Sequence, residues 1–246
     1  MTMTWLVAVH LRMLCALCLC TPVAQGRARH RLHMAQAGGE THNVVQSTSA
    51  AQRNKAPIEA ALRPFLEALS AGSLVLEVAS GHGVHVSHLA TAFTHLQWQP
   101  TEFQADNLVV IDRQCTPLSN VRPAVPLDSS AGKLPNCVSA GSLAAVLAVN
   151  LTHIAPWSAT TGLLALAADG LKAGGHLFIY GPFLRGGQHT SEGNASFDES
   201  LRARDSTWGY RDIDAVLDVG AKHGLKRTDV VSMPANNFML VMTRTG

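Results

Sequence analysis

One acidic residue and two glycines lie close together in an apolar part of the chain. Glu77 lies inside the run Leu74–Ala79, and Gly81 and Gly83 follow it. The run predicts a buried parallel strand followed by a helix. The glycines let the backbone turn sharply and approach a ligand, and the helix start offers unpaired N–H groups to an anion. A buried acid costs free energy unless it is paired, so we expect a nucleotide-like cofactor with a cationic or hydroxyl group here.

Two cofactor classes use such a loop. The dinucleotide fingerprint G-x-G-x-x-G needs a third glycine that this chain lacks, although Glu102 stands where that fold places its ribose-binding acid. The pattern Glu77-x-Ala79-x-Gly81-x-Gly83 resembles motif I of the class I S-adenosylmethionine-dependent methyltransferases. That resemblance implies a glycine loop against the methionine half of the cofactor and a second acid, Glu102, on the ribose hydroxyls. The alternative is an ordinary strand–turn–helix with a solvated Glu77.

Two further polar residues end predicted strands. Asp128 follows a strand expected over 121–127, where related enzymes place an acid or amide near the adenine amino group; a helix or turn cap is the equal alternative. Asn150 closes the apolar strand expected over 143–151. In the resembling enzymes this is where the acceptor meets the methyl group. We therefore count both residues among the cofactor-binding candidates.

Two residues are candidates for a catalytic role next to these strand ends. His153 could act as a base, but a packed histidine is the alternative. Tyr180 ends a strand expected over 176–180 and could place its hydroxyl in the cleft. Because the methyl group of the cofactor is already activated by the sulfonium, the lack of an obvious catalytic dyad does not argue against methyl transfer.

Three histidines, the first of them between the two glycines, are spaced three residues apart, and residues at this spacing are neighbours on a helix. A metal pair is geometrically possible, but no carboxylate or cysteine converges with them in sequence. We predict no metal site and expect His85 to line the cofactor loop. The three residues are His82, His85 and His88.

A long polar segment over 181–211 carries several charges among aromatic residues. We interpret it as an acceptor-binding lid over the strand ends, because loops of this length are usually functional. The alternative is a set of solvated ion pairs worth little each. Arg202 and Arg204, which would bind the acceptor, complete the candidates for a catalytic role, and Phe197, Trp208 and Tyr210 lie around them in sequence.

The composition of the chain limits the class of protein. Its 246 residues suit one α/β domain with extensions, and its net charge is +2 with no dense run of Lys or Arg. Nucleic-acid binding therefore has no compositional support. The apolar stretch over 13–20 is too short to span a membrane.

The N-terminal region predicts targeting. The first 39 residues hold no Asp or Glu and four Arg. We interpret 1–34 as a transit peptide for an organelle, a chloroplast or mitochondrion. A secretory signal, or cytoplasmic translation starting at Met34, are the alternatives. A flexible linker is expected over 35–52, rich in Ala, Gly, Ser and Thr, and the folded domain over 53–246.

Alternating strand and helix patterns predict an α/β fold. Seven strands are expected in a doubly wound, mostly parallel sheet. The last two strands, expected over 225–232 and 238–243, are joined by five residues at 233–237. A parallel crossover needs a dozen or more residues, so these strands must pair antiparallel. This arrangement is that of a Rossmann-like class I methyltransferase.

The chain from residue 51 onward resembles the methyltransferase-like 26 family, also known as the domain of unknown function 938. The resemblance implies the methyltransferase fold and binding of S-adenosylmethionine, but no substrate. Glu102 departs from the usual Asp, and 107–141 departs from the family pattern. The matching motifs are Arg53-Asn54-Lys55-x-Pro57, Leu76-Glu77-Val78-Ala79-Ser80-Gly81-x-Gly83-x-His85, Trp98-Gln99-Pro100, Asn150-x-x-His153-Ile154, Tyr180-Gly181-Pro182-Phe183, Phe197-Asp198-x-x-Leu201-Arg202-x-Arg204-Asp205, Trp208-Gly209-x-Arg211-Asp212 and Met233-Pro234-Ala235-Asn236-Asn237.

The sequence thus favours an S-adenosylmethionine-dependent methyltransferase whose acceptor is a small molecule or a protein. Two alternatives stay open: a pseudo-enzyme that binds the cofactor without transferring a methyl group, and a nicotinamide-dependent reductase. The oligomeric state is open as well.

Overall fold

The computed structural model describes residues 37–246, with side chains from residue 49 onward. The segment expected to be a targeting peptide, 1–34, lies outside the described residues. The linker expected over 35–52 differs from the structure, because helix α1 begins at Ala37 and continues to Leu66. Its second half packs Ile58 and Leu62 into the core, and a helix anchored in this way extends at little cost through residues that tolerate helix.

The elements alternate along the chain as the patterns predict. The clearest difference is the third strand, expected over 121–127 but limited to Val125–Pro126, because Pro123 and Pro126 cannot donate ladder hydrogen bonds. Bounds of the remaining elements are β1 (Leu74–Val78), α2 (Val84–Ala92), β2 (Gln97–Glu102), α3 (Ala105–Cys115), β3 (Val125–Pro126), η1 (Ser129–Ala131), β4 (Leu143–Val149), α4 (Trp157–Gly170), β5 (Leu171–Gly181), β6 (Phe183–Leu184), α5 (Glu192–Arg204), β7 (Arg211–Asp212), α6 (Ile213–Lys222), β8 (Leu225–Met233), η2 (Pro234–Asn236) and β9 (Asn237–Arg244).

Seven strands form one sheet in the order β3-β2-β1-β4-β5-β9-β8. The pairs from β3 to β5 are parallel, and β9 runs antiparallel to both β5 and β8. The predicted Rossmann-like methyltransferase fold with an antiparallel C-terminal strand is therefore confirmed. The order reverses direction between β1 and β4, and ligands of open α/β sheets bind at this switch point.

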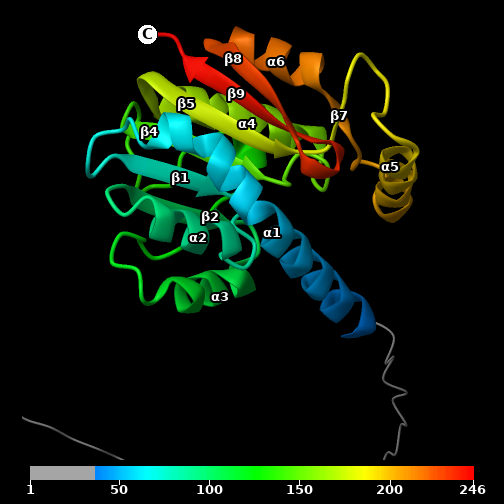
Figure 1. Ribbon diagram of the computed structural model, residues 1–246, viewed down its shortest axis with the longest axis horizontal. Coiled ribbons are helices and arrows are strands. Elements are labelled where there is room, and N and C mark those ends of the chain that lie inside the picture. The colour runs from blue at the N-terminus through cyan, green and yellow to red at the C-terminus, as the bar shows by residue number, and fades with distance from the viewer. Residues whose placement is uncertain (1–36) are drawn as a thin grey trace, which may run out of the picture.

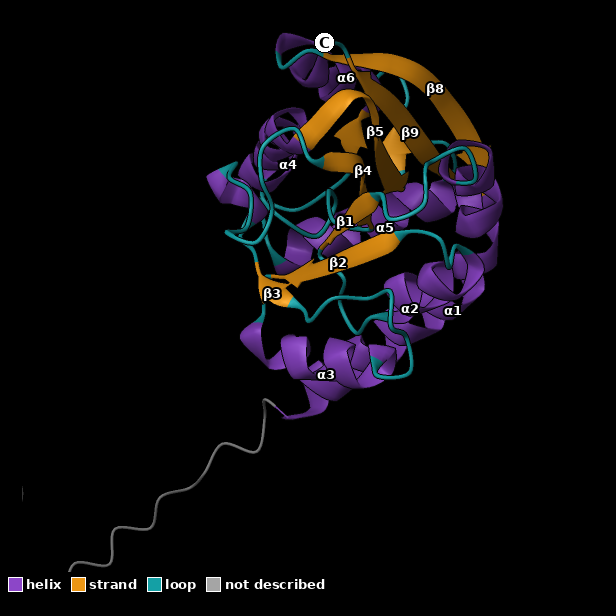
Figure 2. Ribbon diagram, turned by 90° about the vertical axis from the view of Figure 1, so that its left-hand side faces the viewer, coloured by secondary structure: helices purple, strands orange, loops and turns teal. Residues whose placement is uncertain are grey.

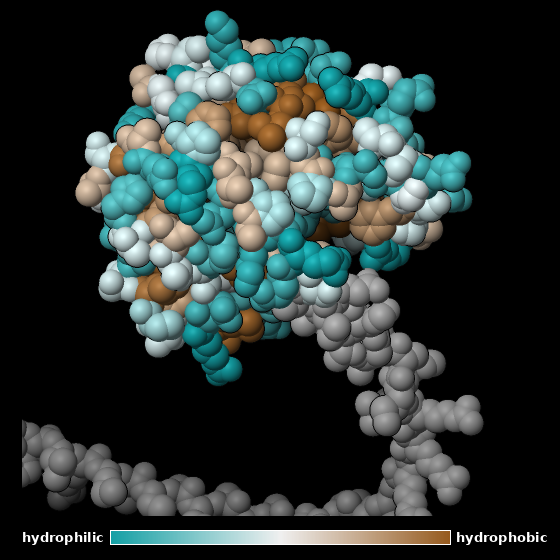
Figure 3. Space-filling view, in the orientation of Figure 1, coloured by the Kyte–Doolittle hydropathy of each residue, from teal (hydrophilic) through white to brown (hydrophobic). Residues whose placement is uncertain are grey.

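Helices cover the two faces of the sheet and divide the core in two. Alternate residues of the central strands point to opposite faces: Leu76 and Val146 join the cluster beneath α4 and α6, while Val75 and Ala145 join that beneath α1, α2 and α3. Figures 1 and 2 show this layering, with α5 lying beyond the carboxyl ends of the parallel strands. In Figure 3 apolar atoms remain visible over β8 and β9, which no described helix covers on this side. Within residues 37–246 no helix is long and apolar enough to cross a membrane.

A close backbone contact fixes the segment after β3 against α4. A Cβ atom on Gly162 of α4 would lie 1.9 Å from the carbonyl oxygen of Ser129. Glycine is therefore required there, since only hydrogen atoms fit between the helix and this carbonyl. The contact sets the position of Asp128, Ser129 and Ser130 at the carboxyl end of the sheet.

We predict that Gly162→Ala destabilises the protein although alanine is the better helix former. The overlap with Ser129 forces the two backbones apart. We expect the free energy of unfolding to fall by about 1–3 kcal/mol, with the helix-propensity gain of about 1 kcal/mol already subtracted. Urea unfolding followed by circular dichroism measures the difference. The control is Asp169→Ala, an exposed position of the same helix, where we expect a neutral or stabilising effect; equal stability of both variants would contradict the prediction.

Candidate functional site

A single cavity of about 1330 Å³ opens at the carboxyl ends of the parallel strands. Its walls come from α1, the loop between β1 and α2, the ends of β2, β4 and β5, the segment around η1, α5 with the residues after it, and the turn between β8 and β9. The cavity therefore lies at the switch point between β1 and β4. Six of the eight predicted cofactor residues line it, namely Ala79, Gly81, His85, Glu102, Asp128 and Asn150.

The loop after β1 approaches the cavity with its backbone. Ala79 and Gly81 adopt the left-handed conformation, with φ of 58° and 57°. For alanine this conformation is strained, and such strain concentrates at ligand sites. Gly83 has φ 77° but does not line the cavity, and a Cβ there would lie 3.2 Å from the Cα of Ile111. This second glycine thus permits the packing of α2 on α3 rather than contact with a ligand.

Glu102 holds the ends of two loops together. Its Oε2 accepts a hydrogen bond from the backbone N–H of Gly81 at 2.7 Å, and its Oε1 accepts from the N–H groups of Phe103 at 2.9 Å and Gln104 at 3.1 Å. Charge-assisted bonds of this kind are the stronger ones. The carboxylate is thereby fixed in the cavity wall, at the place predicted for the ribose-binding acid.

Glu77 lies under the loop, buried and without a partner for one oxygen. Only 1% of the residue is exposed, and Oε2 has no hydrogen bond to any described residue. Burial raises the pKa of Glu77 to about 7, and the negative charge of Glu102 adds to the shift. The predicted solvated alternative is therefore wrong. An unpaired buried carboxyl is costly, and a cationic group above the loop would relieve that cost.

The ends of β4 and β5 bring the two catalytic candidates together. Asn150 has φ 57°, and its N–H donates to the carbonyl oxygen of Tyr180 at 2.8 Å. His153 follows, 5% exposed, and its Nδ1 lacks a partner among the described residues. Asn150, His153 and Tyr180 all line the cavity.

His153 is set in an aromatic group. Its ring centroid lies 6.1 Å from that of Phe197 and 6.2 Å from that of Tyr210, and these two are 6.2 Å apart. Burial lowers the pKa of His153 to about 4, and the charge of Arg211 lowers it further. The imidazole is therefore neutral at pH 7. A pKa so far below the working pH gives little driving force for removing a proton, so the ring is better suited to orienting a ligand.

Helix α1 contributes residues to which the sequence reasoning gave no role. Asn54 lines the cavity, and its Oδ1 is 2.8 Å from Nε2 of His85. The bond fixes the His85 ring, whose pKa is lowered to about 4 by burial and by the nearby His88 and Lys55. The signal was present in the family motif Arg53-Asn54-Lys55-x-Pro57, of which Arg53, Asn54 and Pro57 line the cavity.

The three histidines spaced by three residues have separate partners. His85 contacts Asn54, while His88 Nε2 lies 2.8 Å from a carboxylate oxygen of Glu59, and His82 lines the cavity. The described residues contain no group of three or more His, Cys, Asp or Glu arranged for a metal ion.

The segment predicted as a lid contains helix α5, fixed by a buried acid. Asp198 accepts hydrogen bonds from the N–H of Tyr210 at 2.7 Å, from Arg202 Nε at 3.3 Å, and lies 3.0 Å from His189 Nε2. Burial opposes its charge, but these three partners outweigh it and keep its pKa below the usual value. Arg202 is thus engaged in holding α5 and does not line the cavity, whereas Arg204 does.

The structure confirms the cap that was one of the two predictions for Asp128. This residue lines the cavity, and its Oδ1 accepts from the N–H of Ser130 at 2.8 Å as the cap of η1. Ser129 and Ser130, which follow it, line the cavity together with Glu102.

We predict that Glu77→Gln stabilises the ligand-free protein at pH 8. The pKa of Glu77 is higher in the folded state than in the unfolded state, so the unfolded chain loses this proton first as the pH rises. The resulting loss of folding stability grows as the pH rises from 4.5 to about 7 and is constant above that. At its full size it is about 3 kcal/mol.

Urea unfolding between pH 5 and pH 8 measures this effect, with Glu199→Gln on the exposed side of α5 as the control for amide substitution. The expected gain in stability increases with pH for the Glu77 variant alone. A pH-independent difference, or a loss at pH 8, would show that the buried carboxyl is already paired.

Sequence and structure comparisons agree with this fold. The profile of the family described as protein of unknown function (DUF938) matches residues 45–244. Similar solved structures include the mitomycin 7-O-methyltransferase MmcR, with TM-score 0.69, 12% identity, and coverage of 86% of this chain and 59% of the other.

Two further similar structures carry the same fold. An O-methyltransferase family 2 protein from Planctomyces limnophilus DSM 3776, described in complex with apigenin, has TM-score 0.67 and 16% identity, over 87% of this chain and 63% of that one. CalO1, a methyltransferase in calicheamicin biosynthesis described in its SAH-bound form, has TM-score 0.58 and 14% identity, over 76% and 54%. This chain thus spans roughly half to two thirds of the length of each.

Proposed function

Since the chain belongs to the DUF938 family, and the matched region 45–244 contains every residue that lines the cavity, we propose that it is an S-adenosylmethionine-dependent methyltransferase. The observation that carries the proposal is that one cavity is lined at once by the Ala79–Gly81 loop, Glu102 and Asn150. These are the ends of three adjacent strands, β1, β2 and β4, around the switch point. The similarity to methyltransferases of the same fold supports the proposal.

The residues that line this end of the cavity, and Glu77 buried beneath its glycine loop, fit the chemistry of the cofactor. The unpaired Oε2 of buried Glu77 is suited to the α-ammonium group of the methionine part. Glu102, held by three backbone N–H groups, is an acceptor for the ribose hydroxyls. Asp128, beside Glu102 in the wall, is an acceptor for the adenine amino group.

The bound cofactor would supply a methyl group already activated by the sulfonium, whose C–S bond breaks, leaving the electron pair on sulfur, as the bond to the acceptor nucleophile forms. The residues of this chain would have to align the acceptor and exclude water. Asn150 and the neutral His153 border the place where the acceptor would lie. The aromatic group of Phe197 and Tyr210 around His153 would keep that place dry.

Calorimetric titration with S-adenosylhomocysteine tests the proposal, with NAD as the competing cofactor. We expect saturable binding of S-adenosylhomocysteine alone. Because Glu77 must be ionised to pair with an ammonium group, affinity should rise up to about tenfold between pH 6 and 7.5 for a group with a pKa near 7. Glu77→Gln should bind more weakly and lose this dependence, while Glu199→Gln should keep both.

Failure of a folded sample to bind S-adenosylhomocysteine would overturn the proposal, and binding of NAD instead would favour the reductase. Binding without methyl transfer to any acceptor would identify the pseudo-enzyme.

A further inference from the structure

The end of the cavity beyond β4 and β5 is mainly apolar and aromatic. Two of its side chains are large and partly exposed, since Phe197 exposes 42% and Ile154 43% of the residue surface. An apolar body bound there would remove this area from water, which is favourable. The apolar lining residues at this end are Ile154, Pro156, Phe197, Leu201, Trp208 and Tyr210.

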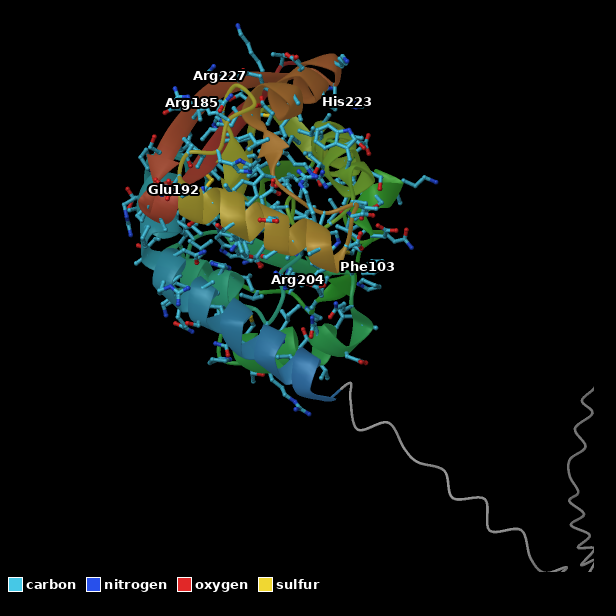
Figure 4. All side chains as sticks on the ribbon, turned by 90° about the vertical axis from the view of Figure 1, so that its right-hand side faces the viewer. Phe103, Arg185, Glu192, Arg204, His223 and Arg227 are labelled. Atoms are coloured by element: carbon cyan, nitrogen blue, oxygen red, sulfur yellow. The ribbon has the colours of Figure 1, made fainter. Side chains whose placement is uncertain are left out.

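One face of α5 combines this apolar surface with a cation. Phe197, Leu201 and Arg204 are spaced by four and three residues, so they share a face of the helix, and all three line the cavity. Seven residues separate Phe197 from Arg204, which corresponds to about 10 Å along the helix axis. Figure 4 shows Arg204 at the far end of α5 from Glu192, on the side toward Phe103 and α1.

Arg204 has no carboxylate partner among residues 49–246. Its Nε donates to the Ser200 carbonyl oxygen of its own helix at 3.3 Å, and the ion pairs of the described side chains do not include it. Arg202, two residues earlier, is instead paired with Asp198. The guanidinium of Arg204 is thus left to a ligand at the mouth of the cavity.

The charges of the cavity wall are unequally distributed. Its two carboxylates, Glu102 and Asp128, follow β2 and β3, and serve the donor end in the proposed function. The wall of α5 carries Arg204 and no lining carboxylate. The other lining arginine, Arg53, lies on α1 and donates to the hydroxyl of Ser49 in its own helix. A cationic acceptor would therefore meet an unpaired arginine, whereas an anionic acceptor would pair with it.

We propose that the methyl acceptor is a small, largely apolar molecule carrying a carboxylate or phosphate group. Its anionic group binds Arg204, its apolar body covers Phe197 and Leu201, and its nucleophilic atom lies near His153, whose ring is 6.1 Å from that of Phe197. The separation of Phe197 and Arg204 along the helix axis, about 10 Å, sets the length scale of such a molecule. This proposal rests on the proposed function, because the bound molecule is a methyl acceptor only if the protein is a methyltransferase. The binding preference itself can be measured without it.

Paired probes test the proposal by isothermal calorimetry, on the full chain with and without saturating S-adenosylhomocysteine. The probes are hydroxylated biphenyl, naphthyl and straight-chain compounds about 10 Å long, each as the carboxylate, the phosphate ester and the uncharged primary amide. We expect at least one acid to bind about tenfold more tightly than its amide, as one charge-assisted pair provides. Arg204→Gln should remove that preference, whereas Arg227→Gln, an exposed arginine of β8, should leave it unchanged.

Three results would overturn the proposal. One is that no acid in the panel binds more tightly than its amide, including the case in which none binds. The second is that the preference survives Arg204→Gln. The third is that Arg204→Gln weakens S-adenosylhomocysteine by the same factor, since the arginine would then serve the cofactor's own carboxylate. A different result would separate the two proposals: S-adenosylhomocysteine does not bind, but the ligand-free protein still binds an acid more tightly than its amide. This result would reject the methyltransferase function and leave the preference for an anionic ligand standing.

Discussion

The site depends on one topological constraint, the reversal of strand order between β1 and β4. The connections after these two neighbouring strands leave toward opposite faces of the sheet, so their loops diverge and a space opens between them. Every other wall of the cavity is built outward from this gap. The glycine loop follows β1, the loop with His153 follows β4, and α5 lies beyond both in Figure 1.

The walls of the cavity are held by charged side chains that are buried or partly buried. Glu102 joins two loops through three backbone N–H groups, and Asp198 joins α5 to the segment with Tyr210. Arg211 adds a third anchor, donating to the carbonyl oxygens of Thr152 and Ala155 in the loop after β4. Each anchor uses a charged side chain to satisfy backbone groups, so the cavity keeps its shape through preorganised dipoles rather than through packing alone.

The fold could be predicted from sequence because its signals are local. The apolar run of β4 and the five residues between β8 and β9 determine strand type and direction without any knowledge of distant contacts. The strand expected over 121–127 is shorter in the structure, because Pro123 and Pro126 lack the N–H groups that a longer ladder needs. The start of α1 could not be found in this way, since Ala, Ser and Thr are common in both linkers and helices, and packing decides between them.

The site was only partly predictable. Residues at strand ends, such as Glu102 and Asn150, are placed by topology and were found, whereas Arg202 and Arg204 look equivalent in sequence. They differ because a helix turns 100° per residue, which directs one side chain to Asp198 and the other to the cavity. Gly83 likewise matched a cofactor motif, but its constraint comes from α3, which is remote in sequence.

The position of Asn54 bears on where the functional unit begins. The sheet and its two core clusters are complete without the residues before Ile58. Ser49, Ala50, Ala51 and Arg53, however, form part of the cavity wall together with Asn54. A chain shortened to the boundary at residue 53 would thus retain its folding core together with Arg53 and Asn54, and would lose Ser49, Ala50 and Ala51 from the cavity wall. In this protein the cavity wall begins earlier in the chain than the folding core.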